Sequence, residues 1–305
     1  MIQRPLISII VLTYNSSEYV LSTLESIKRQ TYTGPIELII GDDCSQDDTV
    51  SICQQWLESN KARFANTRLL QPIENQGVVG NINSCLKIAE GEWIKDIAGD
   101  DILADNAIDT LYHAATDGED CYHFVISSLY SFERDEQIAH PENLAQLKIK
   151  GTNNTITLKN LFQKPSFWTN APSFFYSKKL VVDIGYCPTL FRNVEDRPMM
   201  AKALSKGYTV RIIDAPTVFY RNNPSSITNT VAKAFYAECN WRTYKEILRS
   251  QFSTLQAIDM DLRMLPQWCL MKRKKKDIVT KLFRLGCLLT WAIYRAFTFP
   301  FTRRF

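Results

Sequence analysis

Three pairs of adjacent acidic residues are the strongest chemical feature of the sequence, because paired carboxylates can bind a divalent cation or accept a proton. Asp100 and Asp101 follow an apolar run, where two carboxylates are costly unless a positive charge meets them. Mn²⁺ and Mg²⁺ prefer hard oxygen ligands of this kind. Alternatively, the pair caps a helix expected over 104–116, since Asp favours that position. The spacing leaves metal binding and capping equally open.

Asp42 and Asp43 form a second pair, again directly after an apolar run. One of these carboxylates could accept a hydrogen bond from the imide N–H of a nucleobase. Turn and capping chemistry, helped by Ser45, Asp47 and Asp48, is the alternative. Two acid pairs that follow two strands of one sheet favour a ligand site more strongly than either pair alone.

Glu195 and Asp196 form the third pair, at the expected start of a helix. One of them could act as a general base that takes a proton from a hydroxyl. Acids in a first helical turn are also common partners of the helix dipole, and position alone favours this plainer role.

The first hundred residues predict the elements that would bring these acids together. Helical patterns alternate with four apolar runs, and the first helix has Asn15 and Glu18 in capping-box positions. Strand–helix alternation of this kind predicts βαβ units and a parallel sheet. The runs are typical of buried strands: Leu6–Thr13, Glu37–Gly41, Thr67–Leu70 and Glu92–Ala98.

Ligands of parallel sheets bind beyond the carboxyl ends of the strands. The residues expected at those ends are all polar or small, and we therefore expect one site along that edge. They are Thr13 to Asn15, Asp42 and Asp43, Asn75 to Gly77, and Gly99 to Asp101.

The pattern loosens beyond residue 120. The polar segment Glu133–Asn154 has no period and predicts a long loop, a feature that is often functional or mobile. From Val231 onward the pattern is helical. Between these segments we expect strands at Cys121–Leu129, Ser173–Tyr176, Thr209–Ile213 and Thr217–Tyr220, and helices at Lys178–Ile184 and Glu195–Lys206.

Composition and motif searches exclude several classes of protein. The 305 residues are 45% hydrophobic and 22% charged, an ordinary globular balance. The eight cysteines form no CxxC pair and have no histidine at zinc spacing, so we expect reduced thiols rather than a disulfide framework. The three histidines form no cluster, and Walker A, GxGxxG and GxSxG motifs are absent. The N-terminal residues do not resemble a signal peptide.

Six segments occur in the order typical of one enzyme family: SIIVLTYNSSEYVLSTLESIKRQ, ELIIGDDCSQDDT, ENQGVVGNINSCLKIAEGEWIKDIAGDD, FFYSKKLVVDIG, NVEDRPMMAKALSKGY and VFYRNNPSSIT. Over roughly residues 5–230 the chain resembles an inverting family 2 glycosyltransferase. The resemblance implies an α/β GT-A nucleotide-binding fold over 1–230, with a mostly parallel central sheet flanked by helices, and a helical C-terminal extension over 231–305. It also implies transfer of a sugar from a nucleotide diphosphate to a hydroxyl, usually with Mn²⁺ or Mg²⁺.

The resemblance assigns roles to matching positions. The donor-binding residues are Thr13, Tyr14, Asn15, Asp43, Asn75, Gly77, Asp100 and Arg221. The metal ligands are Asp100 and Asp101, and the catalytic pair is Glu195 and Asp196, of which Asp196 is the expected base. Asp43 matches the acid that pairs with uracil, so a UDP-sugar is the expected donor. Arg221 is expected near the diphosphate.

Two positions depart from the family pattern. Many members have Asp where this chain has Ala98, so metal binding depends on Asp100 and Asp101 alone. A histidine that is common after the Tyr-Arg dipeptide is Asn223 here, which puts one ligand or phosphate contact in doubt.

Trp168 could stack on an acceptor sugar, or be a core aromatic.

The C-terminal tail carries an excess of positive charge. From Trp268 onward there are ten Lys or Arg and one acid, whereas the rest of the chain has 26 basic and 31 acidic residues. The cluster Lys272–Lys276 precedes an apolar segment with Trp291 and Tyr294, which is typical of an amphipathic helix on an anionic membrane. A terminal helix docked on the enzyme is the alternative. A nucleic-acid partner would not explain the apolar residues, and we expect none.

Together, the family resemblance and the tail predict a peripheral enzyme at the cytoplasmic face of the inner membrane that adds a sugar to a lipid-linked glycan. The resemblance further implies a role in surface polysaccharide assembly. A sugar-1-phosphate nucleotidyltransferase is one alternative, although its Gly-rich N-terminal loop is absent. A catalytically inactive nucleotide-sugar-binding homologue is the other, suggested by Ala98.

Overall fold

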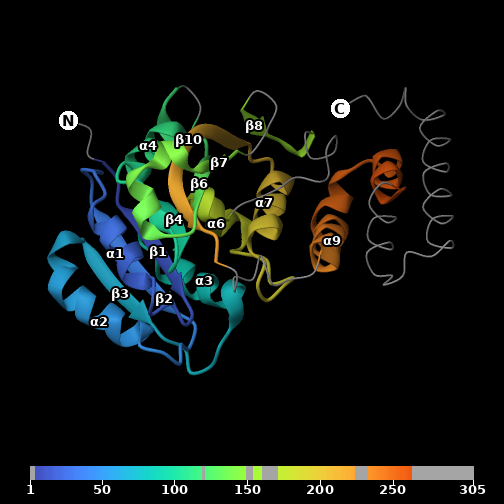
Figure 1. Cartoon of the computed structure of the whole chain (residues 1–305). Coiled ribbons are helices and arrows are strands. Elements are labelled where there is room, and N and C mark those ends of the chain that lie inside the picture. Colours follow the sequence, from blue (N-terminus) through green and yellow to red (C-terminus); the bar gives the residue numbers. More distant parts are fainter. Residues whose placement is uncertain (1–3, 119–120, 149–153, 160–170, 224–232, 263–305) are drawn as a thin grey trace.

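The first half of the protein is a parallel α/β layer, as the sequence predicts. The computed structural model describes residues 4–118, 121–148, 154–159, 171–223 and 233–262 (Figure 1). Four parallel strands lie in the order β3-β2-β1-β4. They are β1 (Ile7–Thr13), β2 (Ile36–Asp42), β3 (Asn66–Leu70) and β4 (Trp93–Ala98), within about one residue of the predicted runs.

Helices cover both faces of this sheet because alternate strand residues point to opposite sides. In β1, Ile9 and Val11 belong to one core cluster with residues of α1 (Val20–Lys28), α2 (Thr49–Asn60) and α4 (Ala107–Thr116). Ile10 belongs to the other cluster, with residues of α3 (Gly77–Ile88), α6 (Lys178–Ile184) and α7 (Asp196–Ser205). The continuous apolar runs are therefore explained by burial on both faces.

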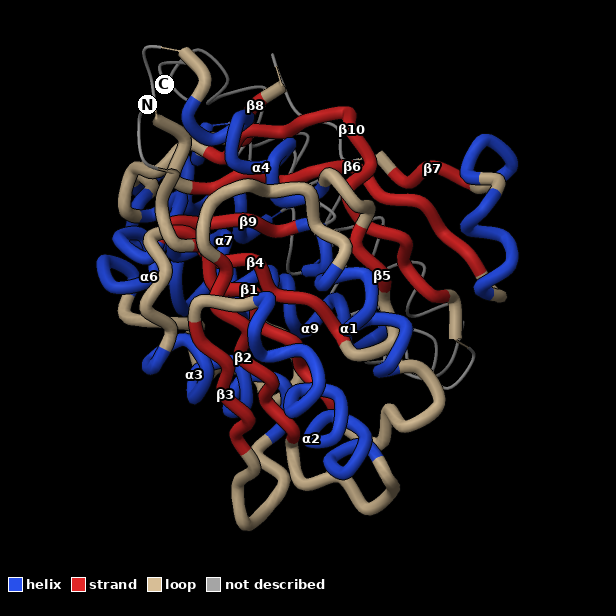
Figure 2. The backbone as a smooth tube through the Cα atoms, turned by 90° about the vertical axis from the view of Figure 1, so that its left-hand side faces the viewer, coloured by secondary structure: helices blue, strands red, loops and turns tan. Residues whose placement is uncertain are grey.

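The second half of the sheet is mixed rather than purely parallel. Strand β9 (Phe174–Ser177) lies antiparallel between β4 and β6 (Phe124–Phe132), and β10 (Val210–Arg221) is parallel to β6. The short β5 (Ile102–Leu103) pairs antiparallel with β10 and completes the order β3-β2-β1-β4-β9-β6-β10-β5 (Figure 2). Two further short strands, β7 (Ala145–Leu147) and β8 (Thr155–Ile156), pair with β6 and β10.

Two expectations for the second half of the sheet were wrong, and the strand expected at Cys121–Leu129 lies three residues later, as β6. The runs 209–213 and 217–220 form the single strand β10, because a register shift at Pro216 lets the strand continue pairing with β6. The segment after β6, expected to be one long loop over Glu133–Asn154, contains regular structure: its described part has 3-10 turns at Asp135–Ala139 and Pro141–Asn143 and then β7.

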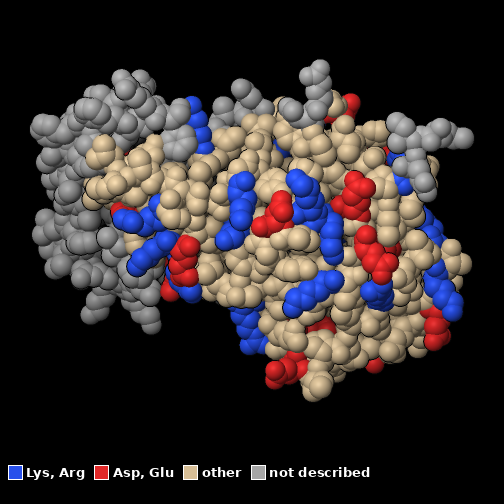
Figure 3. Space-filling view, turned by 180° about the vertical axis from the view of Figure 1, so that it is seen from behind, with Lys and Arg blue, Asp and Glu red and all other residues tan. Residues whose placement is uncertain are grey.

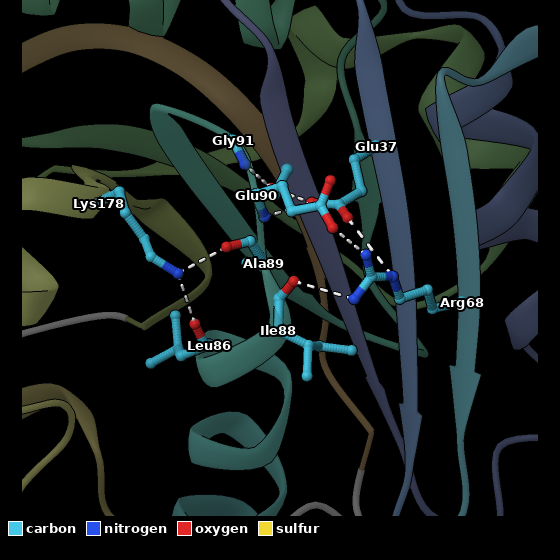
Figure 4. Close-up of polar contacts among 9 residues, drawn as sticks. Glu37, Arg68, Leu86, Ile88, Ala89, Glu90, Gly91 and Lys178 are labelled. Atoms are coloured by element: carbon cyan, nitrogen blue, oxygen red, sulfur yellow. Dashed lines mark hydrogen bonds and ion pairs between the residues drawn. The ribbon is translucent and has the colours of Figure 1, made fainter.

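The amino edge of the sheet contains a polar network in which two basic residues pair with an acid and with backbone carbonyls (Figure 4). Glu37 Oε2 accepts hydrogen bonds from Ser8 Oγ at 2.5 Å and from the Glu90 N–H at 2.8 Å. Arg68 ion-pairs with Glu90 and donates to the Ile88 carbonyl at the end of α3.

A second cation reaches the same helix end. Lys178 donates to the Leu86 and Ala89 carbonyls at 3.0 and 2.5 Å (Figure 4). Cations near a helix C-terminus satisfy its free carbonyls and complement the dipole, so this network fastens α3 to the sheet.

The described part of the C-terminal extension packs against α7. Helix α9 (Lys233–Thr243) lies beside α7 (Figure 1) and continues into a π-helical turn at Tyr244–Leu248. Tyr244, Leu248 and Met260 belong to the core cluster that includes α7. Among the residues that the structure describes, no helix is both long and apolar enough to cross a membrane.

The basic tail and Trp168 lie outside the described residues. On the face of the described body that Figure 3 shows, Lys and Arg are interspersed with Asp and Glu. This face carries no large area of a single sign.

The cysteines agree with the expectation of reduced thiols as far as they are described. Six of them, Cys44, Cys53, Cys85, Cys121, Cys187 and Cys239, are free thiols. Burial raises the pKa of Cys53, Cys85 and Cys239 to about 12, so these three are unreactive packing residues at neutral pH.

Candidate active site

The residues that follow β1 and β2 lie together at the carboxyl edge of the sheet. Thr13 Oγ1 donates to Asp42 Oδ1 at 2.9 Å, and the Thr13 carbonyl accepts the Asp43 N–H at 2.9 Å. The next residue, Tyr14, is 52% exposed, so its ring is available to a ligand.

Asn15 is not the cap of α1, contrary to the sequence-based expectation. It adopts φ 51°, and its Oδ1 accepts the Gln46 N–H at 2.8 Å while its own N–H donates to Ser45 Oγ at 2.8 Å. The helix begins several residues later, with Tyr19 at the N-cap and no side-chain capping bond. Asn15 therefore joins the loops after β1 and β2.

Asp43 connects the end of β2 to the loop before α3. Its two carboxylate oxygens accept the Gln76 N–H at 2.6 Å and the Gly77 N–H at 2.8 Å. Its carbonyl accepts a bond from the Asn75 side chain at 2.9 Å. Each carboxylate oxygen has a second lone pair, so Asp43 can hold this loop and still accept a bond from a ligand.

Asp100 and Asp101 follow β4, and they do not cap a helix. Strand β5 comes directly after them, and α4 begins only at Ala107 with Asn106 at its N-cap. Asp101 is 1% exposed, and its Oδ1 accepts the backbone N–H of Arg221 at 2.9 Å. Its Oδ2 is buried and has no hydrogen-bond partner among the described residues.

The electrostatics of this acid pair favour a bound cation. Burial raises the pKa of Asp101 well above its usual range, and the neighbouring Asp100 raises it further. Burial also raises the pKa of Asp100. The nearby Lys95 is fully buried, but its ammonium donates to the carbonyls of Asp96 and Pro172. Desolvation lowers the Lys95 pKa to about 8.

The acid pair fits a divalent cation as a partial ligand set. The orphaned Asp101 oxygen and the Asp100 carboxylate are hard oxygen ligands of the kind that Mg²⁺ and Mn²⁺ prefer. In the described part of the chain, no group of three or more His, Cys, Asp or Glu residues could hold a metal. A cation here would therefore need further ligands from water or from a substrate.

Arg221, at the end of β10, is buried beside the acid pair rather than exposed to solvent. Its Nε donates to the Asp100 carbonyl at 2.8 Å, and its Nη2 lies 2.6 Å from Asp135 Oδ1. The guanidinium carbon lies 4.5 Å from the ring centroids of both Tyr19 and Phe132. Arg221 thus supports the turn that carries Asp100 and Asp101 and ties it to the segment after β6. Asn223 follows, and its N–H donates to the Arg221 carbonyl at 3.0 Å.

Glu195 and Asp196 lie at the start of α7, as the sequence predicts. Glu195 is the N-cap residue and Asp196 the first residue of the helix. Burial raises the pKa of Glu195 to about 8, and the charge of Asp196 contributes. The Asp196 carboxylate accepts the Arg197 N–H at 2.7 Å.

The residues just before this pair contact the loop before α3. Arg192 donates to Asn75, at 2.7 Å to the carbonyl and 2.5 Å to the side-chain oxygen. Asn193 Oδ1 accepts the Val78 N–H at 3.3 Å. Sequence reasoning missed Arg192, Asn193 and also Asp135, because contacts between segments distant in the chain leave no periodic signal.

The chain is similar in sequence to known glycosyltransferases. It is 32% identical to the glycosyltransferase GlyG of Streptococcus pneumoniae over 43% of this chain and 41% of GlyG. It is 35% identical to WfaP of Escherichia coli, a UDP-Glc:α-D-GlcNAc-diphosphoundecaprenol β-1,3-glucosyltransferase, over 35% of this chain and 40% of WfaP. These matches span less than half the length of either relative.

The fold is also similar to that of a solved structure. Staphylococcus aureus TarS, residues 1–349 in complex with UDP-GlcNAc, matches 94% of this chain and 81% of the TarS chain at a TM-score of 0.63 and 18% identity. At that identity the likeness concerns the fold alone, which is the GT-A fold. The family match, glycosyl transferase family 2, spans residues 8–185, more than half of the chain and most of the site described above. The protein therefore belongs to glycosyl transferase family 2.

Proposed function

We propose that this protein transfers a sugar from a UDP-sugar to a hydroxyl of a lipid-linked glycan, with inversion at the anomeric carbon. One observation carries the proposal: the loops after β1, β2 and β4 and the end of β10 bring two acid pairs to one edge of the sheet, and the segment that leads into the third pair, just before α7, bonds to the loop before α3 at that edge. A nucleotide site, a cation site and a base can share this edge.

The nucleotide is assigned to the loops after β1 and β2. Tyr14 offers an exposed ring on which a base can stack, and Asp43 retains lone pairs for an imide N–H. Uracil presents such an N–H, which supports a UDP-sugar. The UDP-GlcNAc complex of TarS is consistent with this choice.

The diphosphate is assigned to Asp100 and Asp101. A divalent cation held by their carboxylates would neutralise the charge that develops on the leaving diphosphate. Arg221 supports the pair by donating to the Asp100 carbonyl. The ion pair between Arg221 and Asp135 ties the segment after β6 to this point, and we assign that segment to shielding the donor from water.

Asp196 is assigned as the general base. With a pKa of about 8, Glu195 is mostly protonated at pH 7 and would be a poor proton acceptor there. Asp196 would take the proton of the acceptor hydroxyl as that oxygen attacks the anomeric carbon. A single displacement then gives the inverted product.

The acceptor and the location are inferred from the tail and from relatives. WfaP acts, by its name, on a diphosphoundecaprenol-linked sugar. The basic and apolar residues after Trp268 suit an anionic membrane surface, so we assign the protein to the cytoplasmic face of the inner membrane as a peripheral enzyme. Liposome flotation checks this: the full chain should float with anionic vesicles, less at high salt, and a chain ending before Trp268 should not.

The function is tested by a screen of nucleotide sugars for Mn²⁺-dependent hydrolysis and transfer. We expect turnover of a UDP-sugar, its loss in Asp101→Asn, and its retention in Asp105→Asn. Asp105 is a matched control because it lies in the same connection, exposed and paired with Arg29. Absence of turnover for every nucleotide sugar in the wild type would favour the inactive homologue. Formation of a nucleotide sugar from a sugar 1-phosphate would favour the nucleotidyltransferase.

A further inference from the structure

The first amide groups of α3 are bonded by residues from two distant parts of the chain. An α-helix leaves its first four N–H groups without partners inside the helix. Gln76, the N-cap residue, makes no capping bond with its side chain. Instead, the Gln76 and Gly77 N–H groups donate to the carboxylate of Asp43, which directly follows β2.

The next two amide groups donate to a different part of the chain, the segment just before α7. The Val78 N–H donates to Asn193 Oδ1 at 3.3 Å, and the Val79 N–H donates to the Arg192 carbonyl at 3.0 Å. We name these two bonds, with the bonds from Arg192 to Asn75, the interloop contact. The start of α3 thus joins the loop after β2, to which the nucleotide is assigned, to the segment before α7, which leads into the assigned general base Asp196.

The start of α3 and the segment before α7 approach each other too closely for a side chain on Gly77. This residue has φ 76°, and a Cβ built on it would lie 2.8 Å from both the Arg192 carbonyl oxygen and Asn193 Oδ1. Both the backbone conformation and the space therefore require glycine here. The interloop contact depends on the backbone as well as on side chains.

The segment before α7 is also held from its other side. Phe191 and Val194 pack with Cys239 of α9, and Arg242 donates to the Leu190 carbonyl at 3.2 Å. Asn193 therefore lies in a short stretch fixed between α3 and α9, directly before Val194 and the acid pair.

We propose that Asn193 is a positioning residue that sets the location of the Glu195 and Asp196 pair relative to the bound nucleotide. The inference rests on the proposed function, since it assumes a nucleotide at Asp43 and a base at the start of α7. A general base must lie within hydrogen-bond reach of its proton, and a misplacement of about 1 Å can cost about 10²-fold in rate. The bond between the Val78 N–H and Asn193 links the start of α3 to the segment before α7, and so it controls the distance between the nucleotide and the general base.

The test compares Asn193→Ala with Asn193→Asp. The alanine variant loses the acceptor for the Val78 N–H, whereas aspartate keeps it and suits a helix N-terminus. We expect Asn193→Ala to raise KM for the donor and to lower kcat, with kcat/KM reduced about 10–100-fold. We expect Asn193→Asp to restore kcat/KM to within about three-fold of wild type. Asn106→Ala is the matched control, because Asn106 stands at the start of α4 and makes no capping bond.

The split between KM and kcat separates positioning from simple destabilisation. A substitution that only reduces the folded fraction lowers apparent kcat and leaves KM unchanged. Hydrogen exchange measures the contact without any substrate: the Val78 amide should exchange faster in Asn193→Ala than in wild type and Asn193→Asp.

Failure of this inference and failure of the proposed function are distinguishable. If wild type turns over a UDP-sugar and Asn193→Ala matches Asn106→Ala, the positioning role is wrong. It is also wrong if Asn193→Ala loses activity with no faster exchange at Val78, or if Asn193→Asp fails to recover. If wild type turns over no nucleotide sugar, the proposed function itself is wrong.

Discussion

A buried acid has different charged neighbours at the two edges of the central sheet. At the amino edge, Glu37 is fully buried: its Oε2 accepts two hydrogen bonds, and its Oε1 accepts none among the described residues but lies 3.9 Å from the Arg68 guanidinium. At the carboxyl edge, Asp101 is similarly buried and also has one oxygen without a hydrogen-bond partner among the described residues, but its neighbour is another acid, and burial and then the charge of Asp100 raise its pKa well above its usual range. Burying a charge is costly unless it is paired. At the amino edge the chain itself supplies a cation, Arg68, beside the unbonded oxygen, whereas at the carboxyl edge we assign that role to a bound cation.

This contrast predicts that removing a charge has opposite consequences at the two edges. Asp101→Asn, a nearly isosteric change, should reduce transfer to background, a loss of more than about 10³-fold. The melting temperature should stay the same or rise, since a buried carboxylate with one unbonded oxygen is replaced by a neutral amide. Kinetics and thermal unfolding measure both. Activity within a few-fold of wild type, with the same metal dependence, would contradict the assignment.

Glu37→Gln is the matched substitution at the amino edge. It should lower the free energy of unfolding by about 1–3 kcal/mol, because Ser8, Glu90 and Arg68 lose a charged partner. The folded fraction should keep its kcat and KM. An equal loss of activity in Asp101→Asn and Glu37→Gln would contradict the proposed difference between the two edges.

Asp196→Asn, at the carboxyl edge, should have the next largest effect on activity. We expect kcat to fall about 10²–10³-fold while donor affinity stays nearly unchanged, since a base acts only in the transition state. Steady-state kinetics and calorimetric titration of the donor nucleotide measure the two quantities. If Glu195→Gln has this phenotype and Asp196→Asn does not, the base is Glu195.

Asp43→Ala should have a moderate effect on the same edge. Donor binding should weaken by about 1–3 kcal/mol, because the nucleobase and the Gln76 N–H lose their acceptor, and the Gly77 N–H keeps only its longer bond to Asn75 Oδ1 at 3.2 Å. Calorimetric titration of UDP and GDP against the wild type tests the base. Tighter binding of GDP would contradict uracil recognition.

Glu195→Gln should change the pH dependence of stability, the smallest effect of the set. With its folded pKa raised to about 8 and an ordinary value of about 4.3, Glu195 binds its proton more tightly in the folded state than in the unfolded state. The free energy of unfolding of the wild type should therefore fall as the pH rises from about 4 to about 8. Thermal unfolding of Glu195→Gln should show a shallower fall, whereas Glu136→Gln, at an exposed position, should follow wild type. A parallel fall in Glu195→Gln would contradict the raised pKa.

Much of this protein could be predicted from the sequence because the signals are local. Apolar runs such as Leu6–Thr13 and alternating helical patterns identify the first four strands and their helices. The rule for parallel sheets then selects the residues after each strand. For that reason the sequence alone was sufficient to propose that Thr13, Asp43 and Asp101 share one edge.

Only the tertiary structure decided what each of these residues contacts. Arg221 is buried between Tyr19 and Phe132, and Asn15 joins two loops instead of capping α1. Asn193 meets α3 across more than a hundred residues of chain. Periodicity reports which face of an element is apolar, and capping signals report where helices are expected to end. Neither reports which distant segment supplies a partner for a free amide or carboxylate, because that choice depends on how the elements pack.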